Sequence, residues 1–260
     1  MKTLRLMCVL AHPDDESLGT GGTLAKYAAE GVETYLVTAT RGERGRFGDG
    51  GERPAPEIVV GRMREAELCA AAKELGVREV SMLGYPDGAL DTVDPARAQE
   101  AIAGHFRRTR PDVVITFGPE GAYGHPDHIA ISQFTIAAAV RAADRDYAVA
   151  KLYHIAWSTK TWAAYQSALK KLTSTVDRVE RQVIPVPDWG VTTRIDTSAV
   201  WPTVWRAVQC HRTQMSIYKN LAGLADEHHR ALWGVQEYYR AFSLVNGGRT
   251  CETDLFEGLR

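Results

Sequence analysis

The sequence predicts an α/β fold, in which a mostly parallel sheet is flanked by helices and followed by an elaborated C-terminal third. Short apolar runs rich in Val, Ile and Leu alternate with longer segments whose apolar residues recur at helical spacing. This alternation extends over residues 1–156 and is typical of parallel strands joined by right-handed crossovers. Polar segments that contain histidine follow two of the apolar runs, and ligands bind at such strand ends in open parallel sheets.

The first three elements follow one another closely. The apolar run LRLMCVLA over residues 4–11 predicts a buried strand, in which Cys8 is a small buried residue. Periodic apolar residues predict a helix over 21–31, which Gly31 closes. The sequence ETYLVTAT predicts the second strand over 33–40.

The next stretch contains the longest predicted loop of the first half. Residues 41–57 are rich in Gly, Pro and charge, which is typical of a loop. A strongly periodic helix is predicted over 61–76, with Gly76 at its end, and the third strand is predicted over 78–85.

The last part of the predicted sheet begins with a capped helix. Asp94 suits the N-cap and Pro95 the first position of a helix over 94–110. Val and Ile residues predict a fourth strand over 111–118 that is buried on both faces. A further helix and a fifth strand are predicted over 127–143 and 148–158.

The C-terminal third is less regular. We expect a helix over 159–174, short strands and turns over 176–198, and a helix over 201–218 that starts near Thr197 or Ser198.

We find no internal repeat and no low-complexity linker. Residues 1–260 are therefore predicted to form a single domain, with the core sheet and its helices over 1–156 and the elaboration over 157–260.

The composition limits the class of partner and the location. The 31 basic and 32 acidic residues give a net charge of −1, which does not favour a nucleic-acid-binding protein. No segment reaches the roughly 20 apolar residues of a membrane span, and the N-terminal apolar run ends in charge rather than in a signal-peptide cleavage site. The four cysteines form no C-x-x-C pair, so we expect neither a disulfide framework nor a zinc knuckle, and a cytoplasmic location. The sequence leaves a homo-oligomer open.

Two clusters of histidine and carboxylate carry the candidate chemistry. AHPDDE, residues 11–16, follows the first predicted strand, and YGHPDH, residues 123–128, follows the fourth. Strands one and four are neighbours at the switch point of many Rossmann-like sheets, so we expect the two clusters to meet. Imidazoles and a carboxylate suit Zn²⁺ or another first-row divalent ion with one position open for water. The residues alone leave open which of Asp14 and Asp15 ligates and which acts on the water.

The alternative interpretation is two polar loops that merely begin helices, and the second cluster disfavours it. LGTGGT, residues 18–23, lacks the spacing of a dinucleotide-binding loop because position 24 is Leu, so a nicotinamide or flavin site is excluded.

Other polar residues have structural interpretations beside functional ones. Glu16 either charges the first helix turn or orients a ligand, and Asp127 is expected to support a ligand. Arg41 and Glu43 line the cleft or form a surface ion pair, and His211 either packs structurally or approaches the cleft. Four further histidines are expected at the surface: His105, His154, His228 and His229.

Six motifs, AHPDDE, TRGERG, RMRE, YPDG, YGHPDH and CHRTQ, occur in this order over about residues 4–215. Together they resemble the LmbE-like, or PIG-L, family of zinc-dependent N-acetylglucosaminyl deacetylases. The resemblance implies a zinc cofactor, with Fe²⁺ or another divalent metal as alternatives, and a small N-acetylated sugar or glycoconjugate as substrate. It also implies that His12, Asp15 and His128 are the metal ligands and that Asp14 is the general base that activates water.

The remaining roles also come from the resemblance. His125 matches the residue that stabilises the tetrahedral oxyanion or protonates the leaving amine, and Tyr123 matches one that helps to polarise the carbonyl. Arg62 and Asp87 match positions that contact a sugar.

The expected reaction is metal-assisted hydrolysis of an acetamido group, which releases acetate and a free amine. The alternatives are a metal-dependent phosphoesterase or nucleosidase, or a sugar-binding module with a vestigial metal site. We expect substrate selectivity to depend on residues 44–56 and on the C-terminal third, which the shared motifs cover least.

Overall fold

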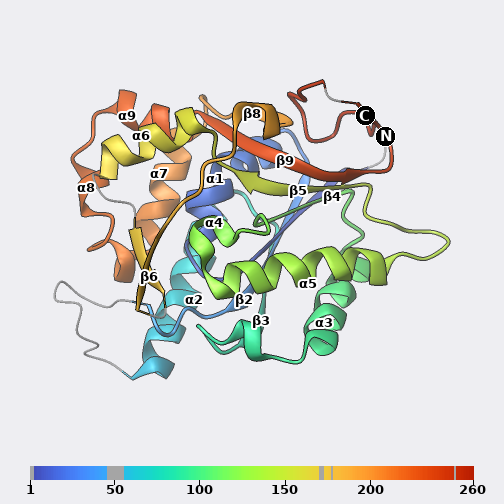
Figure 1. Ribbon diagram of the computed structural model, residues 1–260, viewed down its shortest axis with the longest axis horizontal. Helices are drawn as coiled ribbons and strands as arrows, with labels where there is room; N and C mark the ends of the chain where they lie inside the picture. The colour runs from blue at the N-terminus through green and yellow to red at the C-terminus, as the bar shows by residue number, and fades with distance from the viewer. Residues whose placement is uncertain (1–2, 46–55, 170–172, 177, 249) are drawn as a thin grey trace.

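The computed structural model contains a seven-stranded main sheet, in the order β3-β2-β1-β4-β5-β9-β8, with helices on both sides (Figure 1). It describes residues 3–45, 56–169, 173–176, 178–248 and 250–260. The strands of this sheet are β1 (Arg5–Leu10), β2 (Glu33–Thr40), β3 (Glu79–Tyr85), β4 (Val113–Thr116), β5 (Lys151–Ala156), β8 (Thr193–Asp196) and β9 (Val235–Ser243).

The first five strands are parallel, and β9 runs antiparallel to both of its neighbours, β5 and β8. The predicted α/β class is therefore confirmed, as is the pairing of the first strand with the fourth. Chain order reverses between β1 and β4, so their carboxyl ends form the crevice in which such sheets bind ligands.

The helices cover both faces of this sheet. On one face α1, α2 and α7 pack against one another, and on the other α3 packs against α5. The helices are α1 (Asp15–Ala29), α2 (Glu57–Glu74), α3 (Pro95–Thr109), α4 (Gly121–Gly124), α5 (Pro126–Ala142), α6 (Thr159–Leu169), α7 (Trp201–Cys210), α8 (Lys219–Ala222) and α9 (Asp226–Trp233). The described residues also include the short 3-10 turns η1 (Leu90–Thr92), η2 (Asp188–Gly190) and η3 (Arg212–Gln214).

Two helices start earlier than their sequences predict. Helix α1 begins at Asp15 rather than at residue 21, and α2 begins at Glu57, inside the predicted loop. The early part of α1 contains weak helix formers, but Glu16, Ser17 and Thr20 are buried there. Tertiary packing therefore outweighs local propensity at this helix start, which places the AHPDDE segment directly at a helix N-terminus.

The C-terminal third adds two strands to the main sheet: β8 lies in the stretch for which short strands are predicted, and β9 was not predicted. Strand β9 inserts beside β5, and β8 pairs with β9. A separate hairpin is formed by β6 (Thr173–Val176) and β7 (Val179–Gln182), which packs on α4. Helix α7 has Val200 as its N-cap; Thr197 does not cap it, because its hydroxyl donates to the carbonyl of Trp233.

Two histidines expected at the surface are buried. His154 is 7% exposed because β5 is covered on both faces, and its ring stacks on Tyr239. His229 is 3% exposed and stacks between Trp201 and Trp233, whereas its neighbour His228 is exposed. Adjacent residues of a helix lie on different faces, so His229 is buried although its neighbour His228 is exposed.

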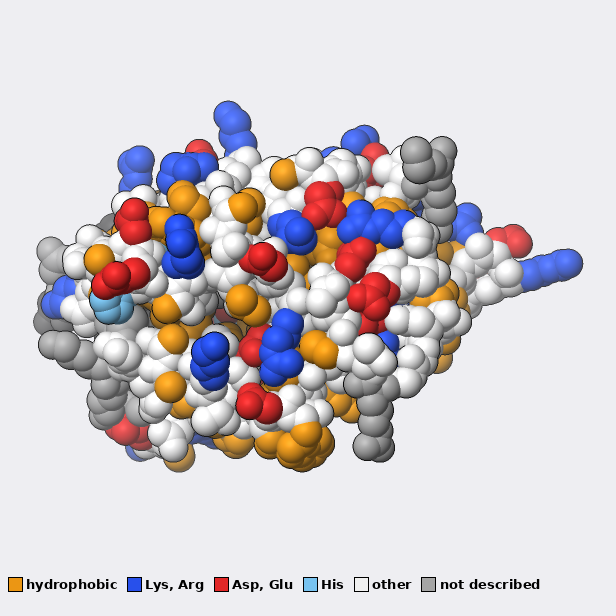
Figure 2. All heavy atoms as spheres, turned by 90° about the horizontal axis from the view of Figure 1, so that it is seen from above, with side chains coloured by type: hydrophobic (Ala, Val, Ile, Leu, Met, Phe, Trp, Pro, Cys, Tyr) orange, Lys and Arg blue, Asp and Glu red, His pale blue; other side chains and the backbone are white. Residues whose placement is uncertain are grey.

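The surface carries charges of both signs. Figure 2 shows Lys and Arg side chains interspersed with Asp and Glu side chains over the face in view. Within the described residues, no helix combines the length and apolar composition that crossing a membrane requires.

A buried ion pair anchors the C-terminal segment to the sheet. The Lys151 ammonium lies 2.6 Å from the carboxylate of Glu252, and both side chains are at most 2% exposed. Arg240, Tyr153 and Thr193 also donate to this carboxylate. Burial alone would raise the pKa of Glu252, but its donors, Lys151 first among them, hold that pKa at about 2.

We predict that Glu252→Gln lowers the free energy of unfolding by about 3–5 kcal/mol, because it leaves Lys151 buried without a counter-charge. Urea denaturation at pH 7 measures this. The folded pKa of Glu252 lies below its ordinary 4.5, so its contribution is present above about pH 4.5 and is lost as the pH falls toward 2. The control is Glu100→Gln in an exposed ion-pair cluster on α3, for which we expect no measurable change. A Glu252→Gln protein as stable as that control would contradict the prediction.

Candidate metal centre and its surroundings

The two histidine clusters meet at the carboxyl ends of β1 and β4. The AHPDDE segment connects β1 to α1, and the YGHPDH segment runs from α4 into α5 (Figure 1). The pairing of Cys8 with Ile115 sets the register of the two strands and brings both segments to the same edge of the sheet. Ala122, just before the second cluster, has a φ of 64°, which is strained for a residue with a Cβ and is held by the surrounding packing.

Three side chains place donor atoms at the spacing of a metal site. His12 Nδ1 lies 3.2 Å from His128 Nε2 and 3.6 Å from Asp15 Oδ2, and His128 Nε2 lies 3.5 Å from Asp15 Oδ1. Ligands about 2.0–2.1 Å from a tetrahedral cation are about 3.3 Å apart, so these three residues fit a bound divalent ion. Two imidazole nitrogens at 3.2 Å also need a proton or a cation between their lone pairs.

Two carboxylates behind His12 determine which of its ring nitrogens faces His128 and Asp15. His12 Nε2 lies 3.1 Å from Asp127 Oδ2 and 3.2 Å from Asp87 Oδ1. The carboxylate of Asp127 also accepts from the backbone N–H groups of Gly88 and Leu90. Nε2 therefore carries the proton and donates it to the carboxylates, which turns the Nδ1 lone pair toward the metal donors. Asp127 thus has the supporting position that its sequence predicts.

His12, His125 and His128 also form a group of close donor atoms, and so does His12 with the carboxylates of Asp87 and Asp127. Their oxygens are already committed, since Asp127 accepts two backbone N–H groups and Asp87 accepts the N–H of Arg44. Burial alone would raise the pKa of Asp87, but its hydrogen bond with His12 holds that pKa at about 2. We therefore assign these two carboxylates to the support of His12 rather than to the metal.

His128 is held as a neutral imidazole. It is 2% exposed, and its ring stacks on Phe117 with 3.9 Å between centroids and 7° between planes. Burial lowers the pKa of His128 to about 3. A metal ligand must be unprotonated, so burial prepares this ring for coordination.

Asp14, the residue before Asp15, has an unusual backbone conformation. Its φ is 100°, which is rare for a residue other than glycine. Its Oδ2 accepts from Arg64 Nη2 at 3.2 Å and from the Tyr218 hydroxyl at 3.0 Å. Burial raises the pKa of Asp14, and Arg64 opposes that rise. A buried carboxylate with a raised pKa is suited to take a proton near neutral pH.

His125 and Tyr123 border the same space. His125 Nδ1 accepts from the backbone N–H of Asp127 at 3.2 Å as the cap of α5, so the neutral ring carries its proton on Nε2. Burial lowers the pKa of His125 and keeps it neutral. The His125 ring lies 4.9 Å from His12 and 4.8 Å from His128 between centroids, and Tyr123 is edge-on to His125 and His128.

The family model described as "PIG-L: GlcNAc-PI de-N-acetylase" matches residues 7–139. The chain is 34% identical to the 1D-myo-inositol 2-acetamido-2-deoxy-alpha-D-glucopyranoside deacetylase of Mycolicibacterium vanbaalenii, over 100% of this chain and 99% of that protein. It is 33% identical to the enzyme of the same name from Kineococcus radiotolerans, over 98% of this chain and 83% of that protein.

The chain belongs to the PIG-L family.

Its fold is also similar to that of a solved structure, a conserved protein from Thermus thermophilus. The TM-score is 0.66 at 26% identity, over 94% of this chain and 98% of that one. The match to the PIG-L family model runs from Met7 in β1 to Ala139 in α5, and it includes every catalytic, metal and substrate residue that the resemblance implies.

The sequence did not predict that Arg64, Tyr218 and His211 would support Asp14. Arg64 is 4% exposed and reaches Asp14 and the carbonyls of Pro13 and Gly42. Tyr218 and His211 come from the C-terminal third, outside the region that the PIG-L model matches. His211 does approach the site: its Nε2 lies 2.7 Å from Glu16 Oε1.

The buried face of α2 could have distinguished Arg64 from Arg62 in the RMRE motif. Val60, Arg64 and Leu68 are four residues apart, so they share one face, and all three are buried. Arg62 lies on the exposed side of the helix.

Arg62 instead lines an open cavity of about 470 Å³ between the start of α2 and the ends of β2 and β3. Arg41 and Glu65 form a 2.7 Å ion pair on its wall. Glu43 links this cavity to the metal site through Asp87. Its Oε1 accepts from the backbone N–H of Asp87, and the carboxylate of Asp87 contacts His12. The Oε2 of Glu43 is buried and has no hydrogen-bond partner within the described residues. Arg41 and Glu43 thus both line this cavity, and the ion pair that Arg41 forms is with Glu65 rather than with Glu43.

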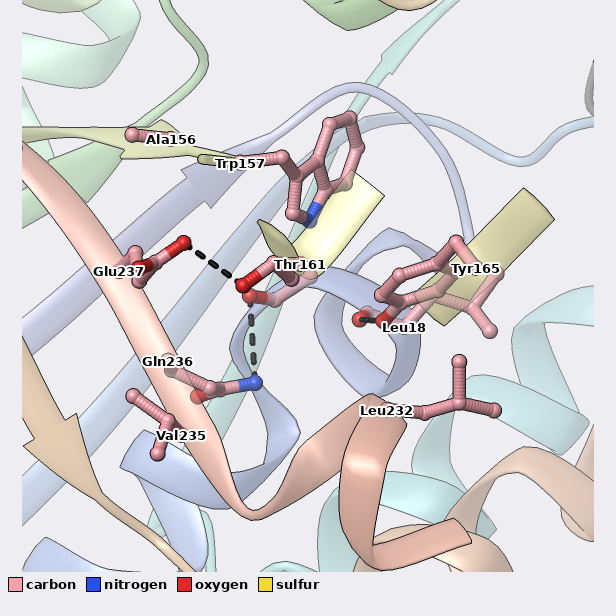
Figure 3. Close-up of a pocket in the computed structure, with 10 residues that line it drawn as sticks. Leu18, Ala156, Trp157, Thr161, Tyr165, Leu232, Val235, Gln236 and Glu237 are labelled. Atoms are coloured by element: carbon pink, nitrogen blue, oxygen red, sulfur yellow. Dashed lines mark hydrogen bonds between the residues drawn. The ribbon is translucent and has the colours of Figure 1, made fainter. Parts of the chain in front are cut away.

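A second cavity, of about 10 Å³, lies between α1, α6, α9 and β9 (Figure 3). Its polar side chains bond within the protein, since Thr161 donates to Glu237 and Gln236 donates to the carbonyl of Gly19. It has room for about one water and none for a sugar. Residues 46–55 of the expected selectivity loop lie outside the described residues.

Proposed function

We propose that this chain is a metal-dependent hydrolase that removes the acetyl group from an N-acetylglucosamine-type sugar conjugate and releases acetate and a free amine. The observation that carries the proposal is that donor atoms of His12, Asp15 and His128 lie 3.2–3.6 Å from one another, and that Asp14, whose carboxylate has a raised pKa, directly precedes Asp15 in the chain. The PIG-L family membership and the names of the two deacetylases support the substrate class.

His12, Asp15 and His128 would hold the cation, and two imidazoles with one carboxylate suit Zn²⁺, with Fe²⁺ as the alternative. Such a cation, when bound, lowers the pKa of a coordinated water to about 7 and polarises the acetamido oxygen.

The chain's own residues then move the protons. Asp14 takes a proton from the attacking water, for which its partly buried carboxylate with a raised pKa is suited. The Nε2–H of neutral His125 donates to the oxyanion or to the leaving nitrogen, and burial keeps the Tyr123 phenol protonated as a second donor. Asp87 keeps His12 in the tautomer that ligation needs, and its role as a sugar contact stays a prediction.

The direct test is a panel of N-acetylated sugars and their conjugates, assayed for amine release with protein reconstituted with Zn²⁺ or Fe²⁺. Phosphate release from sugar phosphates is measured in parallel, because a phosphoesterase would gather the same residue types. Amine release from N-acetylglucosamine conjugates is expected. Phosphate release without amine release would overturn the proposal.

We predict that Arg62→Ala raises the KM for a sugar conjugate about tenfold and leaves kcat unchanged. Arg62 lines the 470 Å³ cavity, and none of His12, Asp15 and His128 does, so we expect its loss to remove substrate binding that is equal in the ground and transition states. Steady-state kinetics measure both constants, and Arg97→Ala on the exposed side of α3 is the control. An unchanged KM would remove Arg62 from the substrate site.

A further inference from the structure

Two side chains of the C-terminal third converge on Asp14 from different directions. Tyr218 precedes α8, and its hydroxyl donates directly to Asp14 Oδ2 at 3.0 Å. His211 ends α7 and acts one residue further away, through Glu16. Neither residue lies in the region that the family model matches.

The contact with Tyr218 restrains the carboxylate. Tyr218 and Arg64 both donate to Oδ2, so this oxygen is held from two elements, α2 and the segment before α8. A carboxylate with one oxygen fixed by two donors cannot rotate freely, and Oδ1 is the oxygen that neither donor occupies. Burial keeps the phenol of Tyr218 protonated, since it raises the pKa of Tyr218 well above its ordinary value.

The contact through Glu16 restrains the backbone. Asp14 has a φ of 100°, a conformation that costs about 1–3 kcal/mol unless its surroundings enforce it. The N–H of Asp14 donates to Glu16 Oε2 at 3.0 Å, while Glu16 Oε1 accepts from Ser17 and faces His211. Glu16 and His211 are both 0% exposed, so the imidazole is the buried partner that compensates this carboxylate.

The segment that carries both residues is itself fixed to α2. The N–H and hydroxyl of Thr213 both donate to the carboxylate of Glu67, at 2.9 and 2.7 Å. Helix α2 also carries Arg64, the other donor to Asp14. The segment from His211 to Tyr218 and helix α2 therefore hold the base as one unit.

We propose that Tyr218 and His211 are positioning residues for the catalytic base: Tyr218 fixes the Asp14 carboxylate through Oδ2, and His211 fixes the Asp14 backbone through Glu16, so that Oδ1 is the oxygen that receives the proton from water. This assigns the C-terminal third a part in catalysis, and it rests on the proposed function of Asp14.

The kinetic test is Tyr218→Phe, alone and combined with Asp14→Asn. We expect Tyr218→Phe to lower kcat about tenfold, with KM and bound metal unchanged, because one hydrogen bond to the base is lost. In the Asp14→Asn background the same change should alter the residual rate less than twofold, since the group that Tyr218 positions is no longer a base. Tyr239→Phe, at a 45% exposed site on β9, is the control and should match the parent. An unchanged kcat, or an equal loss in both backgrounds, would overturn the proposal.

A structural test does not depend on activity and separates this inference from the proposed function. Crystal structures of Tyr218→Phe and His211→Asn are compared with those of the parent and of Tyr239→Phe. We expect the Asp14 carboxylate to rotate or to occupy several orientations in the first variant, and the N–H contact to Glu16 to be lost in the second. If His211→Asn does not fold, Tyr218→Phe alone decides. An Asp14 side chain that is unmoved in Tyr218→Phe would overturn the inference even if the protein is a deacetylase. If the parent protein releases no amine but Asp14 is displaced in Tyr218→Phe, the result would instead count against the proposed function and leave this inference standing.

Discussion

Asp14→Asn should lower kcat for amine release by about 10²- to 10⁴-fold, the range that general-base catalysis contributes. Asn cannot accept a proton from water at neutral pH, but it has nearly the shape of Asp and tolerates a positive φ, so the φ of 100° at this position remains accessible. The metal content should stay close to that of the parent, because Asp15 rather than Asp14 contacts the two imidazole donors.

Two measurements check this, single-turnover kinetics and metal content by atomic absorption. Asp188→Asn, whose parent side chain is 78% exposed, is the matched control and should retain full activity. Near-normal turnover in Asp14→Asn would show that another group activates the water. Loss of both metal and activity would show that Asp14 is a ligand.

His128→Ala should abolish stoichiometric metal binding and reduce amine release to background. The substitution removes one of three donors and leaves a cavity beside Phe117, against which the ring stacks. Two donors, His12 and Asp15, fall short of the three protein ligands that catalytic zinc sites usually have. We expect less than about one tenth of a metal ion per chain after dialysis against a buffer that leaves the parent loaded.

The control for this variant is His228→Ala, because His228 is an exposed histidine on α9. It should bind metal as the parent does. Full metal occupancy in His128→Ala would refute the role of His128 as a ligand.

The sequence could predict that the two histidine clusters meet, because their positions follow from where two parallel strands end. Each cluster directly follows an apolar strand, and parallel strands present their carboxyl ends at one edge. The pairing of β1 with β4 then brings His12 within 3.2 Å of His128 across 116 residues of chain. The same rule placed Asp127 behind His12, since Asp127 precedes His128 at the start of a helix.

The support of Asp14 could not be predicted, because it depends on how distant segments dock. Tyr218 lies 204 residues from Asp14 in the chain, and no strand or helix rule brings the two together. Strand β9 was missed for a similar reason: it pairs with β5, which lies about 80 residues earlier, and only three of its nine residues are buried. The burial of Arg64, in contrast, could have been predicted from the sequence, because Arg64 is four residues from both Val60 and Leu68 on the same face of α2.

The most direct test is anomalous diffraction at the zinc edge from crystals of the reconstituted protein. We predict one strong peak within about 2.0–2.2 Å of His12 Nδ1, an oxygen of Asp15 and His128 Nε2, with Asp14 outside bonding distance. A peak held instead by Asp87 and Asp127, or no peak at the edge that β1 and β4 share, would contradict the account.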